Sequence, residues 1–381
     1  MFSKLLSSKS SILQKIIILL LAALFLIFIF LFNKGERIQL INQDGTGYEK
    51  AVVESVVKDN VQQDGSRVGN QLVKVRILTG DKKGQVFDAT SPSGYLYGAN
   101  CTENMKVIVS ISTSGNSSAV SVYNYDREPI IYAFLALFLL MIWLIGGKRG
   151  LKSALGLVFT FICIIFLFIP MLYKGYSPLL SAVIIAILIS IVSICLVGGL
   201  TIKTISAILG TIIGVVISGG VAITFGHFAN ISGYNVSEIE ELIFISNNAN
   251  LKVSGLLFAA TLIASLGAVM DVSISVASTI NELYINNPNL TKKELFSSGV
   301  NVGRDIIGAM SNTLILAYTG GAINTMILIY SYNMKYNQIV NMYSIGIDIM
   351  QAISGSIAII LTVPLVSFIS SSLLTNKSLK K

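Results

Sequence analysis

The sequence predicts an α-helical integral membrane protein with about eight transmembrane helices and a small all-β domain between the first two. Hydrophobic residues make up 53% of the 381-residue chain and charged residues only 12%, against about 25% charged residues in soluble domains. Residues 36–128 differ from the rest, because they hold balanced acidic and basic side chains and no apolar run long enough to cross a bilayer.

Residues 1–35 are predicted to form a cytoplasmic N-terminus and the first transmembrane helix. The apolar run Ile16–Phe32 follows Lys4, Lys9 and Lys15. A secretory signal would end in small residues at its cleavage site, whereas this run ends in the bulky sequence Phe-Leu-Phe-Asn-Lys. We therefore expect an uncleaved helix with its N-terminus in the cytoplasm.

Residues 36–128 are predicted to form an extracytoplasmic β domain. Five short runs rich in Val and Ile are separated by turn residues such as Asp44-Gly45 and Thr79-Gly80-Asp81, which favours a small barrel of OB or SH3 type. No platform of stacked aromatic side chains is evident. The domain has either a structural or gating role, or it recognises a ligand.

Residues 129–381 are predicted to form a seven-helix transmembrane bundle with a short cytoplasmic C-terminus. Eight spans in all place both termini on the same side. Lys and Arg gather in the segments assigned to the cytoplasm, as the positive-inside rule requires. The predicted spans are 129–146, 151–173, 178–199, 204–226, 253–277, 305–332 and 342–371.

The net charge of +8 is explained by this orientation and indicates no nucleic-acid partner, since the polar domain has no basic cluster. The chain has three cysteines and one histidine, without metal-ligand spacing. It also has no nucleophile–base pair and no phosphate-binding loop. We therefore expect neither an enzyme nor a bound metal or cofactor.

Asp271 is the most informative residue, because it is a carboxylate inside the apolar run 253–277. A charge in the hydrocarbon costs about 2.5–3.5 kcal/mol on insertion scales unless it faces water or a partner. Gly267, Asp271 and Ser275 recur every four residues and therefore share one helix face. Asp271 either holds helices together through a hydrogen bond or carries protons or ions.

The two following spans also hold polar residues. Arg304, Gly308, Ser311 and Asn312 form a stripe in the first of them, and Asp348 lies near the start of the second. Polar faces avoid lipid, so we expect these stripes to turn toward a shared interior, with Ser311, Asn312 and Arg304 as partners of Asp271.

Several glycines are expected to allow close packing of transmembrane helices. Gly210 and Gly214 form a GxxxG motif, and Gly267 and Gly308 lie within the polar stripes. Small residues let helix backbones approach each other in lipid.

Five segments of the chain carry a resemblance to a known family: Gly146–Gly150, Gly199–Thr211, Gly267–Ser278, Gly303–Thr313 and Ser354–Pro364. They resemble the YibE/F-like membrane proteins of bacteria. The resemblance implies a multispanning bacterial membrane protein and carries no established biochemical activity.

A weaker resemblance links the bundle to the membrane core of SecD/SecF proteins and resistance-nodulation-division permeases. It rests on a Gly-x-x-x-Asp motif, here Gly267 to Asp271, followed by a run of hydrophobic and hydroxyl residues. In those families a transmembrane carboxylate at this place carries protons. Arg304 and Thr313 would match the arginine and hydroxyl positions of the following span. The eight predicted spans and the β domain depart from that pattern.

Two functions are therefore expected from the sequence. The first is an ion- or proton-coupled transporter or export accessory in the bacterial plasma membrane, with an unidentified small ion or solute as its cargo. Its coupling site would be Asp271, and the other transport candidates are Ser275, Arg304, Ser311, Asn312 and Asp348. The second is a non-transporting scaffold whose external domain recognises an envelope protein. In both cases the lipid bilayer is a partner, and the sequence leaves the oligomeric state open, an oligomer included.

Overall fold

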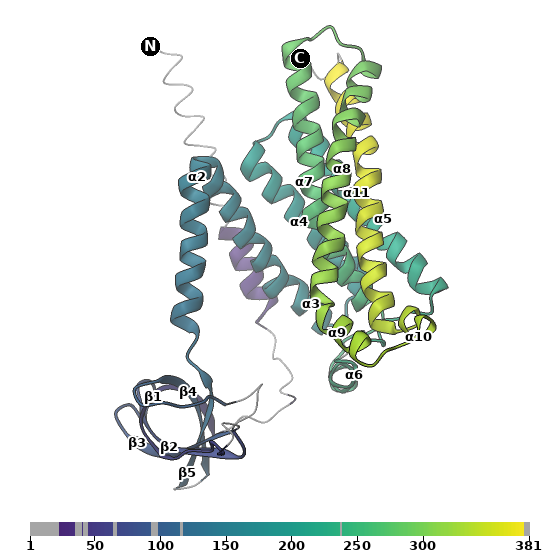
Figure 1. The fold of residues 1–381 in the computed structure, drawn as a ribbon. Helices are drawn as coiled ribbons and strands as arrows, with labels where there is room; N and C mark the ends of the chain where they lie inside the picture. The colour runs from purple at the N-terminus through teal and green to yellow at the C-terminus, as the bar shows by residue number, and fades with distance from the viewer. Residues whose placement is uncertain are drawn as a thin grey trace, which may run out of the picture. The chain divides into compact units, whose positions relative to one another are not determined.

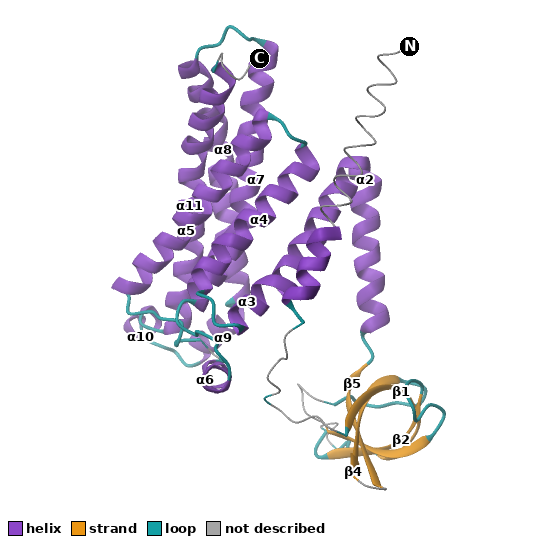
Figure 2. Ribbon diagram, turned by 180° about the vertical axis from the view of Figure 1, so that it is seen from behind, coloured by secondary structure: helices purple, strands orange, loops and turns teal. Residues whose placement is uncertain are grey.

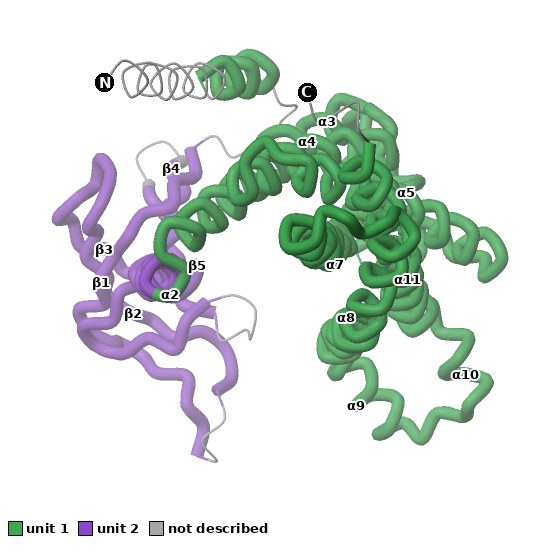
Figure 3. Tube along the Cα trace, turned by 90° about the horizontal axis from the view of Figure 1, so that it is seen from above, with its two compact units in different colours: residues 1–38, 145–381 green, residues 39–144 purple. Residues whose placement is uncertain are grey.

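The structure is a computed structural model that describes residues 23–34, 40, 45–63, 67–92, 98–114, 117–236 and 238–376. The chain divides into two compact units (Figure 3). One unit comprises residues 39–144, and the other comprises residues 1–38 and 145–381.

The first unit contains a closed five-stranded β-barrel (Figure 2), as the sequence predicts. Its strands follow the order β1-β2-β3-β5-β4, and all pairs are antiparallel except β3 with β5. The strands are β1 (Thr46–Lys58), β2 (Asn70–Ile77), β3 (Val86–Pro92), β4 (Lys106–Ser114) and β5 (Ser117–Tyr125).

The barrel interior follows the alternation of its strands. In β2 every second side chain from Gln71 onward is buried, ending with Val75 and Ile77. Gln71 is the polar member of this set, and its side chain is satisfied: Cys101 N donates to Gln71 Oε1 at 2.8 Å, and Gln71 Nε2 donates to Asp59 at 2.9 Å. Ser91 similarly donates to Ala99 O at 2.6 Å and accepts from Ala99 N at 3.1 Å.

The barrel is joined closely to the first long helix. Strand β5 ends at Tyr125, and α2 (Glu128–Cys163) begins three residues later. Lys50 of β1 forms ion pairs with Glu128 and, at 4.0 Å, with Asp126. The carboxylate of Glu128 raises the pKa of Lys50 above its ordinary value.

The predicted place of the barrel between two transmembrane helices is wrong, because the barrel precedes the first candidate span found among the described residues. The described part of the predicted first span is the short apolar helix Ala23–Phe32. This helix lies against the second unit's other helices, with Asn33 donating to Phe166 O at 2.7 Å. Residues 1–22 lie outside the described part of the chain.

The remaining helices form a bundle (Figure 1). They are the π-helix Ile164–Phe168 and the α-helices α3 (Ile169–Tyr173), α4 (Pro178–Gly198), α5 (Ile202–Phe228), α6 (Ile239–Asn248), α7 (Leu256–Asn286), α8 (Lys292–Gly321), α9 (Ile323–Ser331), α10 (Tyr336–Val340) and α11 (Tyr343–Thr375).

The prediction of eight spans is confirmed only in part. The described residues contain five helices long and apolar enough to cross a membrane, or six if α8 and α9, which meet at 58°, are counted as one broken span. The predicted spans 129–146 and 151–173 fall in the run Glu128–Tyr173, in which two helices meet at a kink at Gly147. Gly147 interrupts that run with φ 53° and ψ −136°, a conformation that suits glycine.

The bundle core is built around α11, which packs against α5, α7 and α8, while α7 packs in turn against α5 and α8. Glycines permit the closest approaches. A Cβ on Gly210 would lie 2.1 Å from Val366 of α11, and one on Gly214 would lie 2.2 Å from Thr362. On α8, Gly303 leaves the same kind of space for Val363. The GxxxG motif thus lies where α5 meets α11 and α7.

Candidate functional site

Asp271 lies midway along α7, on a side that no described part of the chain covers. Gly267, Asp271 and Ser275, which we call the Asp271 stripe, are all exposed. The opposite side of α7 is buried, with Val269, Val272 and Ser273 at 0% exposure. Figure 3 shows α4 and α8 on either side of α7 in the helical unit. The stripe therefore faces away from the interior of the bundle, contrary to the expectation of a shared polar interior.

The α8 residues expected to partner Asp271 do not bond to it. Arg304, Gly308 and Asn312 are exposed, and Arg304 Nη1 donates to Asn301 of its own helix at 3.3 Å. Ser311 is half-buried, and its hydroxyl has no hydrogen-bond partner among the described residues. Within the part of the chain that the structure describes, Asp271 forms no ion pair and no hydrogen bond.

The glycines of the GxxxG motif and those of the polar stripes differ in their surroundings. Gly210 and Gly214 lie against α11 side chains, as described above. A Cβ on Gly267 or Gly308 would meet nothing within 4 Å. Gly267 and Gly308 therefore leave room on the outer side of α7 and α8 instead of bringing helices of this chain together.

The uncovered polar residues make α7 and α8 unusual as membrane-spanning helices. An ionised carboxylate that faces hydrocarbon costs about 2.5–3.5 kcal/mol on insertion scales. A stripe of Gly, Asp and Ser has little apolar surface whose contact with lipid could offset this cost. In a bilayer, this side of α7 must therefore face water or a partner helix, or the carboxyl group of Asp271 must be protonated.

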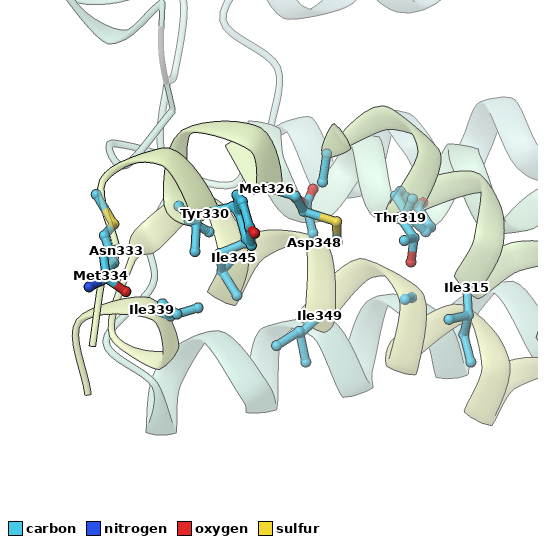
Figure 4. A pocket seen from close by; sticks show the side chains of 14 residues that line it. Ile315, Thr319, Met326, Tyr330, Asn333, Met334, Ile339, Ile345, Asp348 and Ile349 are labelled. Carbon is cyan, nitrogen blue, oxygen red and sulfur yellow. The ribbon is translucent and has the colours of Figure 1, made fainter. Parts of the chain in front are cut away.

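Asp348 lies in a different place, in a cavity of about 840 Å³ at the end of the bundle where α8 bends into α9 (Figure 4). The lining comes from α8, α9, α10 and α11 and from the turn around Asn333. It is mostly apolar, with Ile315, Met326 and Ile349 among its members. The cavity therefore combines one carboxylate with an apolar wall.

The bend that shapes this cavity has a local cause. Gly320 and Gly321 end α8, and Ala322 leaves the helical region with φ −84° and ψ 2°. Glycine is a poor helix former, by about 1 kcal/mol relative to alanine. Broken helices in transporters often border ligand sites, because their freed backbone groups and side chains line a cavity.

The comparisons with known proteins bear on the helical part of the chain. A family model described as YibE/F-like protein matches residues 134–376. The chain belongs to the YibE/F-like family. Every candidate residue of the two sites lies inside the matched segment, whereas the barrel strands, residues 46–125, precede it. No curated protein and no solved structure matches the chain.

Membership of the YibE/F-like family, together with the candidate spans, identifies a polytopic membrane protein in a lipid bilayer. The likeness to SecD/SecF proteins and resistance-nodulation-division permeases is not shown by any of the comparisons.

Two features of the structure were not anticipated from the sequence. One is the Asp348 cavity, which includes Tyr318, Tyr330 and Asn333. The Gly320-Gly321 pair inside the predicted span 305–332 is the signal that could have indicated the bend. The other is an exposed aromatic pair on the barrel, Tyr48 and Tyr123, with ring centroids 5.1 Å apart. These tyrosines come from β1 and β5, so strand pairing was needed to bring them together.

Proposed function

We propose that the protein is a proton- or ion-coupled transporter, or an accessory to export, in the bacterial plasma membrane rather than an enzyme. Asp271 is its coupling residue. One observation carries the proposal: a carboxylate midway along a membrane helix has no partner among the described residues. A carboxylate is a costly choice for packing, since amides and hydroxyls hold helices together without carrying a charge.

Protonation of Asp271 changes what α7 can face. In its ionised form the carboxylate favours water or a bound cation. As a neutral acid it can face lipid or a neighbouring helix at lower free energy. A proton therefore shifts the balance between two arrangements of the bundle by the difference in its affinity for them. Ser275 and the α8 residues Asn312 and Ser311 supply further polar groups for a hydrated route on this side.

The first experiment measures proton flux into proteoliposomes that contain the full-length protein and a pH-sensitive dye. Asp271→Asn removes the titratable group with little change in shape, and we expect it to abolish flux. Asp271→Glu keeps the group and is expected to retain part of it. Asp305→Asn is the matched control, because Asp305 is an exposed carboxylate of α8 outside both sites. Full flux through a well-folded Asp271→Asn protein would overturn the proposal.

The second candidate function is a scaffold whose barrel recognises an envelope protein. The observation that favours it is the exposed pair Tyr48 and Tyr123, since paired aromatics on a polar domain are typical of contact surfaces. Deletion of residues 40–125 separates the two functions. A transporter core would retain proton flux, whereas a scaffold would lose partners that can be captured by crosslinking in membranes.

A further inference from the structure

We propose that the Asp348 cavity binds an organic cation with an apolar body, held by an ion pair with Asp348. This inference concerns ligand binding at the α8–α9 bend. It does not depend on proton coupling at Asp271, which lies outside the residues that line the cavity.

The charge of the cavity favours a cation. Among the described residues that line it, Asp348 is the one with a carboxyl side chain, and none is a lysine, arginine or histidine. No residue in the described part of the chain forms a salt bridge or hydrogen bond with this carboxylate, and Asp348 is half-buried. A partly desolvated carboxylate that lacks a cation from its own chain gains most from a cation supplied by a ligand.

The size and donor set exclude a bare metal ion as the preferred ligand. A cavity of about 840 Å³ lies in the range of about 300–1,000 Å³ that suits small organic molecules. Calcium takes about six to eight oxygen ligands, and magnesium needs near-octahedral geometry. The carboxylate of Asp348 and the neutral side-chain oxygens of Thr319 and Asn333 are too few, in a cavity of this width, to coordinate either ion.

The apolar side chains of the lining suit the apolar body of such a ligand. Apolar contact is offered by Ile315, Met326, Ile345 and Ile349, of which the last three lie nearest Asp348 in Figure 4. Two tyrosines, Tyr318 and Tyr330, also line the cavity. An aromatic face within about 6 Å of a cation attracts it, by about 0.5–2 kcal/mol depending on desolvation. The combination of one acid, tyrosines and aliphatic side chains therefore suits an amine or quaternary ammonium attached to an apolar group.

The cavity can be reached from the end of the bundle. Asp348 lies in the second turn of α11, close to the point where the chain leaves α10. Tyr330, at the end of α9, is 89% exposed although it lines the cavity. A ligand can thus enter without crossing the packed core of α5, α7 and α11.

The test uses the full-length protein in lipid nanodiscs and a matched pair of probes, 1-naphthylmethylamine and 1-naphthylmethanol. Equilibrium dialysis measures binding, with empty nanodiscs to subtract partition into lipid. We expect the amine to bind on the order of tenfold more tightly than the alcohol, a difference of about 1.4 kcal/mol. Asp348→Asn should remove this preference, whereas Asp348→Glu and the control Asp305→Asn should keep it.

A second variant keeps the test decisive if Asp348→Asn does not fold. Thr319→Lys adds a fixed ammonium group to the lining at an exposed position and should abolish the preference for the amine. Equal binding of amine and alcohol by the unchanged protein would overturn the proposal and identify the cavity as an apolar crevice for lipid. Retention of the preference in folded Asp348→Asn, or its loss in Asp305→Asn, would overturn it as well.

Discussion

The barrel and the helical bundle differ in how they treat buried polar groups. In the barrel the buried side chains of Asn60, Gln71 and Ser91 all have hydrogen-bond partners. The four ion pairs found among the described residues also lie in the barrel or join it to α2. In the bundle, nine buried serine hydroxyls lack a partner in the described chain, and so do the carboxylates of Asp271 and Asp348.

This difference indicates which region depends on molecules outside the chain. A buried polar group without a partner costs about 1–3 kcal/mol, so native proteins satisfy most of them with protein or ordered water. The barrel satisfies its own. The bundle leaves hydroxyls and carboxylates for water, an ion, a ligand or another helix. Polar groups that await such partners are expected in a membrane protein that binds or moves something polar.

The largest effect should come from filling space in the bundle core. Gly210→Leu forces a side chain into Val366, and overpacking costs about 1–3 kcal/mol or more where neither helix can move. The matched control is Gly267→Leu, because a side chain there meets nothing within 4 Å.

We expect thermal unfolding of the purified protein to shift to lower temperature for Gly210→Leu and to stay unchanged for Gly267→Leu. The opposite ranking would show that the outer side of α7 is covered in the assembled protein, by a second copy or another helix. The uncovered polar side described above would then be an interface.

An effect of intermediate size is expected when a hydrogen-bonded serine hydroxyl is removed, compared with one that has no hydrogen-bond partner. Ser91→Ala in the barrel leaves the Ala99 N–H unpaired and leaves the Ala99 carbonyl with the weak Cys101 thiol donor alone, so it should cost about 1–3 kcal/mol. Ser273→Ala in α7 removes a hydroxyl that has no partner among the described residues and should change stability by less than about 0.5 kcal/mol.

Hydrogen–deuterium exchange of peptides from β2 and from α7 reads both changes in one experiment. Faster exchange is expected in β2 of Ser91→Ala, and no change in α7 of Ser273→Ala. A large change at α7 would contradict the comparison, because it would mean that water or an ion already satisfies Ser273 in the membrane.

The smallest expected effect is a change in the stability of the barrel at acidic pH. The Asn60 backbone N–H, Gln71 and Arg67 hydrogen-bond the Asp59 carboxylate, which lowers its pKa below the ordinary value. A lowered pKa in the folded state stabilises the barrel above the unfolded pKa of about 3.9, and this stabilisation is lost as the pH falls through the folded pKa.

Exchange at β2, corrected for the intrinsic rate at each pH, should therefore be slower in the unchanged protein than in Asp59→Asn near neutral pH. The two proteins should converge below about pH 4. If the difference in exchange rate persisted at low pH, the effect of Asp59→Asn would come from a change in local packing and not from the loss of the negative charge.

Much of the architecture was predictable from local patterns. The predicted span 178–199 corresponds to α4, Pro178–Gly198, and the five runs of Val and Ile correspond to the five strands. Hydropathy and the Gly146-Gly147 pair placed a break between residues 146 and 151, and Gly147 is where the two helices of the run Glu128–Tyr173 meet. Hydropathy also assigned the apolar run ending at Phe32 to a full span, of which the described part is a ten-residue helix.

The candidate sites were predictable only in part. Helical spacing shows that Gly267, Asp271 and Ser275 share a face, but not whether other helices cover that face. Gly210 and Gly267 have similar sequence surroundings, yet one lies against Val366 and the other is open. The Asp348 cavity depends on the angle between α8 and α9, and tertiary geometry of that kind leaves little trace in a single sequence.

The short connection between the barrel and α2 has a mechanical consequence. Two residues separate β5 from α2, and ion pairs of Lys50 clamp the joint. The barrel and the first part of α2, up to Leu144, therefore belong to one compact unit. A molecule that grips the barrel would apply torque directly to a membrane helix, without a slack tether to absorb it.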